Sequence, residues 1–215
     1  MALIKDLINF CWFIFKWGIV PGTIVTLAVV LYLHQQLDTE IRGQIESRFA
    51  EHYHDLAVAV RAASRVEGEG IEIRDLSIKQ PGTEGPQATL LHVEQAFFRC
   101  NTELADLLGD RVHVRQAVIR RPTVRFARMP DGTWSGSRLW PVPALSDTPP
   151  DVTVENGTIE IIDLTKTPPS TLTFRDVNLT VKSRPPDAND PGGKPVRVLE
   201  GTLRGDHMGR IEIRG

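Results

Sequence analysis

The chain has 215 residues, a formal net charge of −2 and 41% hydrophobic residues, enough for one sizeable domain or for a small domain with a membrane anchor. The absence of a basic excess argues against a nucleic-acid binder that depends on phosphate contacts. The two cysteines, Cys11 and Cys100, lie far apart in the sequence, which disfavours a disulfide framework or a structural zinc site.

The first predicted element is a transmembrane helix within residues 1–34. Lys16 is the one charged residue between Leu7 and Leu33, and about 27 helical residues at about 1.5 Å each exceed a hydrocarbon core of about 30 Å. A cleaved signal peptide and a buried core helix are the competing interpretations, but no small-x-small cleavage pattern follows Leu33. The expected anchor residues are Trp17, Ile19, Val20, Ile24, Val25, Leu27, Val29, Val30, Leu31, Tyr32 and Leu33.

The orientation of this anchor follows from the charges beside it. Lys5 and Lys16 precede the apolar span, whereas Asp38 and Glu40 follow it. The positive-inside rule therefore predicts an N-terminus in the cytoplasm and an exported C-terminal part.

Residues 35–65 predict an amphipathic linker helix. Ile41, Ile45, Phe49, Leu56 and Val60 recur at three- and four-residue steps among charged residues. Two placements of this apolar stripe remain open: it covers the end of a following sheet, or it lies on the membrane surface.

From Val66 onward the hydrophobic period changes to two, which predicts about eight short strands within 66–215, mostly as an antiparallel meander. A phase slip at Asp75 predicts a bulge, and Asn156-Gly157 predicts a second turn or bulge. Arg121-Pro122 is expected to separate two strands, and Pro130-Asp131-Gly132 to form a tight hairpin turn. A short helix is expected over Glu103–Leu108.

These strands carry polar residues on one side, among them Glu72, Arg74, Thr153 and Glu155, so one face is expected in solvent and the other is apolar. Arg210–Gly215 continues the strand pattern with no capping element. Either a longer protein continues this sheet, or a partner strand completes its edge.

A weak internal repeat accompanies the pattern. Val66–Asp75 resembles Val154–Asp163, and Phe174–Leu179 follows the same rhythm. Repetition of one strand unit suits an elongated sheet.

Residues 105–134, from Ala105 through Arg121-Pro122 to Asp131-Gly132-Thr-Trp134, resemble the N-terminal region of the AsmA-like family, related to TamB-type lipid-transfer proteins. Val152–Asp163 and Phe174–Leu179 are similar to the family's next element. Many members are longer than this chain, and here Thr-Trp-Ser-Gly follows the aspartate-glycine turn instead of the more usual Asn-Leu.

The resemblance implies a mainly β protein of the inner membrane, with a curled, groove-like antiparallel sheet over 66–215 exported to the periplasm. It implies a role in phospholipid transport or outer membrane biogenesis, with membrane lipid as the cargo. Lipid tails are able to cover an apolar sheet face as well as a second sheet does, although a dry core remains the alternative. The expected groove lining is Val112, Val114, Val118, Val124, Phe126, Val154, Ile159, Ile161, Leu172 and Phe174.

The sequence contains no nucleophile elbow, P-loop, zinc-protease or Cys-x-x-Cys motif. We therefore expect no enzyme, no cofactor and no metal, and we assign Asp131, Asp151 and Asp163 to turns and Cys100 to the interior. The alternative function is an envelope scaffold that recruits a protein partner through its open sheet edge.

Overall fold

The computed structural model describes residues 38–215 except 84, 101–112, 144–145, 147–148, 185–195 and 207. Almost all of them belong to one compact unit, Ile41–Gly215. The predicted anchor, the predicted short helix and Val112 lie outside the described residues. Among the residues that are described, no helix is long and apolar enough to span a membrane.

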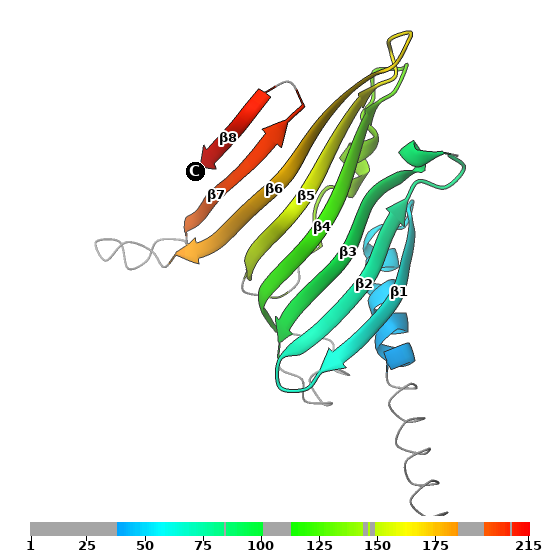
Figure 1. Ribbon diagram of the computed structural model, residues 1–215. Coiled ribbons are helices and arrows are strands. Elements are labelled where there is room, and N and C mark those ends of the chain that lie inside the picture. Colours follow the sequence, from blue (N-terminus) through cyan, green and yellow to red (C-terminus); the bar gives the residue numbers. More distant parts are fainter. Residues whose placement is uncertain are drawn as a thin grey trace, which may run out of the picture. The chain divides into compact units, whose positions relative to one another are not determined.

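The described unit is one helix and one sheet (Figure 1). Residues 38–52 are helical, and short 3-10 turns follow at η2 (Pro86–Ala88) and η3 (Ser135–Leu139). The eight strands, paired in chain order, are β1 (Ala57–Val66), β2 (Gly70–Lys79), β3 (Thr89–Cys100), β4 (Val114–Arg128), β5 (Asp151–Asp163), β6 (Ser170–Arg184), β7 (Val196–Gly205) and β8 (Met208–Arg214). The mainly β prediction with eight strands is confirmed.

The sheet is mixed, which corrects the expectation of an antiparallel sheet. β4 and β5 pair in parallel, with Val124 opposite Ile159, while the other six pairings are antiparallel. The hairpin turn after β4 reverses the chain, as expected from Asp131-Gly132, and η3 follows it. The chain therefore enters β5 in the direction of β4. The sheet is not closed, because β1 and β8 do not pair with each other.

The helix is shorter than the sequence predicted. It ends at residue 52, and Ala57–Val66 form β1 instead of its last turns. Ala-Val-Ala-Val over 57–60 alternates with a period of two, and the β-branched valines favour a strand once β2 is available as a partner. The stripe of the remaining helix packs on the sheet, because Ile41, Ile45 and Phe49 contact its buried cluster.

Four strand residues adopt left-handed backbone conformations: Asp75 (φ 51°), Arg121 (φ 48°), Asn156 (φ 55°) and Asp176 (φ 53°). The pairing register shifts beside Asn156 and Asp176, which therefore mark bulges. The phase slip expected at Asp75 is present, because Ile73 and Leu76 both lie in the buried cluster. The register of β2 with β1 and β3 is nevertheless the same on both sides of Asp75, so the expected bulge is not found there. Asn156-Gly157 is a bulge rather than a turn. The expected break at Arg121-Pro122 is wrong, because β4 runs through both residues. A bulge adds one residue to a strand, so the alternation of side chains is shifted by one position there.

Candidate functional site

One face of the sheet is apolar from β1 to β8 once the bulges are taken into account. Antiparallel partners point to the same side, so the pairs Val60–Leu76 and Ile159–Phe174 identify positions on this face. We call it the apolar face. The other side, the polar face, carries most of the charged side chains.

The first half of the apolar face is covered. Its residues on β1 to β4, including Val60 and Ile73 at 3% exposure each, form a buried cluster against the helix. A second cluster around Ile78 and Leu90 packs against Leu139 of η3. In the view of Figure 1 the helix lies behind β1 and β2, and η3 lies behind β4.

The second half of the apolar face, on β5 to β8, has no such cover from the described elements. We call it the open half. η3 reaches β3 and β4, whereas β5 to β8 are contacted mainly by their neighbouring strands. The side chains of the open half are half-buried, apart from Val177 at 2% exposure. They are Val152, Val154, Ile159, Ile161, Leu172, Phe174, Val177, Leu179, Val181, Leu199, Leu203, Ile211 and Ile213.

Two glycines of β7 interrupt this apolar surface, and neighbouring side chains fill the gaps. A Cβ on Gly201 would lie 2.4 Å from Cδ2 of Leu179, and one on Gly205 would lie 3.4 Å from the Phe174 ring. Leu179 and Phe174 therefore lie over the glycines of the adjacent strand. The result is a continuous hydrocarbon surface across β6 and β7.

Charge is confined to the ends of the open half. Between these ends the register places only apolar side chains and glycine on the face. Asp163 at one end pairs with Lys166 at 3.5 Å, and Arg197 lies at the other end opposite Ser183. The interior of the open half is thus suited to hydrocarbon and has no charged group with which to bind a polar ligand.

Five of the predicted lining residues lie on the open half: Val154, Ile159, Ile161, Leu172 and Phe174. Val124 lies beside them on β4, opposite Ile159.

Three other predicted residues are placed elsewhere. Val118 pairs with Phe97 and Thr153 and belongs to the polar face, because the alternation of β4 changes phase at the left-handed residue Arg121. Val114 is buried in the covered cluster. The Phe126 ring lies against η3, since a Cβ on Gly136 would come within 1.9 Å of its Cδ1.

Sequence reasoning missed the contribution of the last strands, where Leu179, Val181, Leu199, Leu203, Ile211 and Ile213 complete the open half. A repeated sequence pattern could have indicated this contribution. Ile73-Arg-Asp75-Leu-Ser-Ile78 and Phe174-Arg-Asp176-Val-Asn-Leu179 share one pattern, and both aspartates adopt a left-handed backbone conformation. The repeat proposed between Val66–Asp75 and Val154–Asp163 is not structural, because the first contains the β1–β2 turn and the second runs within β5.

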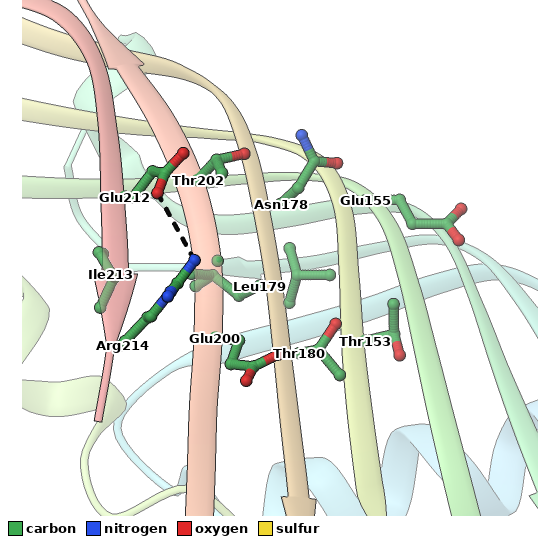
Figure 2. A pocket seen from close by; sticks show the side chains of 12 residues that line it. Thr153, Glu155, Asn178, Leu179, Thr180, Glu200, Thr202, Glu212, Ile213 and Arg214 are labelled. Atoms are coloured by element: carbon green, nitrogen blue, oxygen red, sulfur yellow. Dashed lines mark ion pairs between the residues drawn. The ribbon is translucent and has the colours of Figure 1, made fainter.

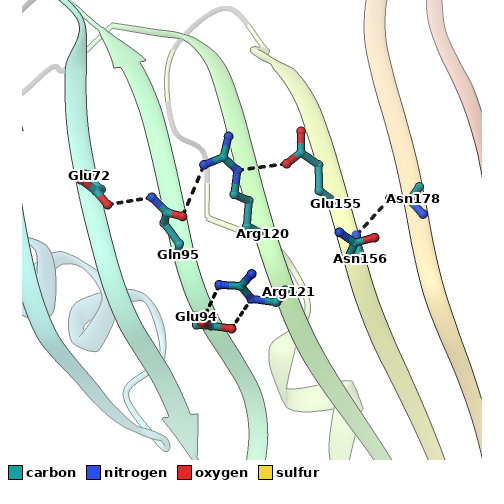
Figure 3. A network of polar contacts seen from close by, with 8 residues as sticks. All are labelled: Glu72, Glu94, Gln95, Arg120, Arg121, Glu155, Asn156 and Asn178. Atoms are coloured by element: carbon teal, nitrogen blue, oxygen red, sulfur yellow. Dashed lines mark hydrogen bonds and ion pairs between the residues drawn. The ribbon is translucent and has the colours of Figure 1, made fainter.

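The polar face carries a ladder of cross-strand contacts (Figure 3). Gln95 donates to Glu72 at 2.7 Å, and Arg120 donates to Gln95 at 3.4 Å and to Glu155 at 3.0 Å. The hydrogen bond from Arg74 holds the pKa of Glu72 below its usual value. The ladder connects β2 through β5 and suits a face that remains in water.

A second contact on this face joins Arg121 to Glu94, with Nη2 donating to Oε1 at 2.6 Å. This arginine holds the pKa of Glu94 below its usual value. Farther along the face, the backbone N–H of Asn156 donates to Oδ1 of Asn178 at 3.0 Å.

A hollow of about 410 Å³ lies over β5 to β8 (Figure 2). Thr153, Glu155, Thr180, Glu200 and Thr202 line it from the polar face, and the pair Glu212–Arg214 lies at 3.9 Å. Within the described part of the chain, no group of three potential metal ligands forms a metal site. This hollow differs chemically from the apolar groove that the sequence predicted.

Asp131 lies in a turn and Asp163 directly precedes one, as expected, whereas Asp151 is the first residue of β5 and accepts a hydrogen bond from the N–H of Ser183 at 3.0 Å. Oδ1 of Asp131 accepts from the N–H and Oγ1 of Thr133 at 2.9 and 2.6 Å, and Asp163 bonds Thr165 in the same way. These hydrogen bonds hold the pKa of both carboxyl groups below the usual value. Cys100 is buried, and burial raises the pKa of its thiol, which opposes reactivity.

No model of a known protein family matches the chain. A comparison with curated proteins also finds no match. The AsmA-like resemblance therefore remains a prediction, and the function has to be argued from the geometry of the apolar face.

Proposed function

We propose that this chain is a single-pass, membrane-anchored envelope protein that carries phospholipid acyl chains on the open half of its apolar face. The anchor places the N-terminus in the cytoplasm and the sheet in the periplasm of a two-membrane envelope. The activity is phospholipid transfer or a step of outer-membrane assembly that depends on it. No chemical step is involved.

The observation that carries the proposal is the unbroken apolar surface of β5 to β8, left uncovered by the described elements. A continuous, partly exposed apolar surface of this kind is costly in water and favours a contact with a protein, lipid or membrane. The interior of the open half offers hydrocarbon and no charge. Acyl chains can pack against such a surface, whereas a polar metabolite would find no hydrogen-bonding or charged partner on it.

Two adjacent residues of β5 supply a matched test. Ile161 pairs with Leu172 on the apolar face, and Ile162 pairs with Thr171 on the polar face. A photo-crosslinking amino acid such as benzoylphenylalanine is placed at one position or the other in the full chain, in cells. We expect phospholipid adducts, identified by mass spectrometry, from position 161 and few from position 162.

Equal labelling at both positions would point to non-specific contact with lipid. Protein adducts at position 161, without lipid, would instead favour the envelope scaffold. Either result would replace the proposal.

A further inference from the structure

The two edges of the sheet differ in whether their backbone groups are free. At β1, the N–H of Val60 donates to a carboxylate oxygen of Glu46 on the helix at 2.7 Å. The helix thus places a negative side chain at the position that an incoming strand would use. This is a recognised way to block the addition of strands to an edge.

At β8 the corresponding groups are unprotected by the described residues. Leu199 and Gly215 exchange two backbone hydrogen bonds, of 2.8 and 2.9 Å. Because antiparallel pairs alternate, the N–H and C=O groups of Arg210, Glu212 and Arg214 point away from β7. Among the described strands, none lies beyond them.

The side chains of β8 alternate between the two faces of the sheet. Ile211 and Ile213 pair with Leu203 and Gly201 and continue the open half. Arg210, Glu212 and Arg214 alternate with them on the polar face.

One of these charges is poorly matched within the sheet, whereas Arg214 lies opposite an anion, Glu200. Arg210 lies opposite another cation, Arg204, whose ion pair with Asp176 is long, at 3.8 Å. Glu212 and Arg214 pair at 3.9 Å along their own strand and are largely exposed. A carboxylate beyond Arg210 would relieve the contact between like charges.

We propose that the β8 edge binds an extended strand of a partner protein in which two apolar residues alternate with acidic, basic and acidic residues. The strand pairs antiparallel, the stronger arrangement per residue. Its acidic residues lie opposite Arg210 and Arg214, and its basic residue lies opposite Glu212. Its two apolar residues widen the open half by one strand, about 4.8 Å.

The test uses the full chain in detergent micelles and a fluorescent peptide, Ser-Glu-Ile-Lys-Ile-Glu-Ser. The control peptide, Ser-Lys-Ile-Glu-Ile-Lys-Ser, has every charge reversed. Three cross-strand pairs change from attraction to repulsion, so we expect binding of the control to be weaker by about tenfold in fluorescence anisotropy. The peptide should slow amide exchange of Arg210, Glu212 and Arg214 and leave β1 unchanged.

A variant of the protein with inverted charges on β8 tests whether the β8 edge binds the peptide. The triple variant R210E/E212R/R214E changes exposed side chains, and it should prefer the control peptide. The variant E46A serves as the matched control, since it alters the other edge and should keep the original preference.

An unchanged preference in the triple variant, or no binding of either peptide, would overturn the proposal. Concentration-dependent self-association without peptide, abolished by E212R, would also overturn it and would identify a second copy as the occupant. None of these results depends on whether the open half binds lipid.

Discussion

The difference between the two halves of the apolar face predicts unequal costs for the same substitution. Ile73 is 3% exposed and packs in the covered cluster beneath the helix, whereas Ile161 is half-buried on the open half. Ile73→Ala removes contacts and leaves a cavity that the surrounding atoms fill incompletely, which costs about 2–5 kcal/mol. Ile161→Ala leaves no enclosed cavity and loses only part of its transfer free energy, about 1–2 kcal/mol.

The assay is urea unfolding of the full chain in detergent micelles, followed by far-UV circular dichroism. Each variant is compared with the parent for its free energy of unfolding at an unchanged dependence on urea. The covered position should be the more costly by at least about 1 kcal/mol. Equal costs would refute the reasoning, because they would mean that Ile161 is enclosed as tightly as Ile73 and that the second half of the face is a dry core.

Three further predictions concern packing, backbone and pH. Gly136→Ala places a methyl group within 1.9 Å of the Phe126 ring and should destabilise the fold by about 1–3 kcal/mol in urea unfolding; a neutral effect would contradict the packing of η3 on β4. Asn156→Val puts a β-branched residue at φ 55° and should destabilise the fold by about 1–2 kcal/mol, measured as a lower midpoint of thermal unfolding. Asn156→Gly should change this midpoint little. Similar losses of stability in both variants would mean that the asparagine side chain, and not the backbone conformation, is the source of the effect. The hydrogen bond from Arg74 lowers the pKa of Glu72. The stabilising contribution of Glu72 is therefore present above the ordinary carboxyl pKa of about 4.3 and is lost as the pH falls through the lower folded value. Glu72→Gln should make the free energy of unfolding depend less on pH in this acid range, and an unchanged dependence would rule out this ion pair as a source.

The position of the bulges links this fold to its proposed activity. Without the extra residues at Asn156 and Asp176, the apolar residues that follow in β5 and β6 would turn to the polar face. The bulges keep Val154 and Ile159, which are five positions apart, on one side. Strict alternation of side chains along these strands would divide the apolar residues between both faces. The bulges therefore allow a long sheet to have one hydrocarbon face.

Much of the candidate site was predictable from alternation alone. Val154, Ile159, Ile161, Leu172 and Phe174 were predicted to share a face and do so, because each bulge had a local sign such as Asn-Gly. Val118 was misplaced for the converse reason. Arg121-Pro122 looks like the end of a strand, yet β4 continues through it, and the left-handed conformation of Arg121 accompanies a change in the phase of the alternation.

By itself, the sequence determined the strands, the hairpin turn at Asp131-Gly132 and the existence of a polar and an apolar face. These features depend on neighbouring residues, through backbone preferences and alternation with a period of two. The tertiary structure alone decided the parallel pairing of β4 with β5, the end of the helix at residue 52, and which half of the apolar face is covered. Those outcomes depend on contacts between segments far apart in the chain, whose energies no local pattern encodes.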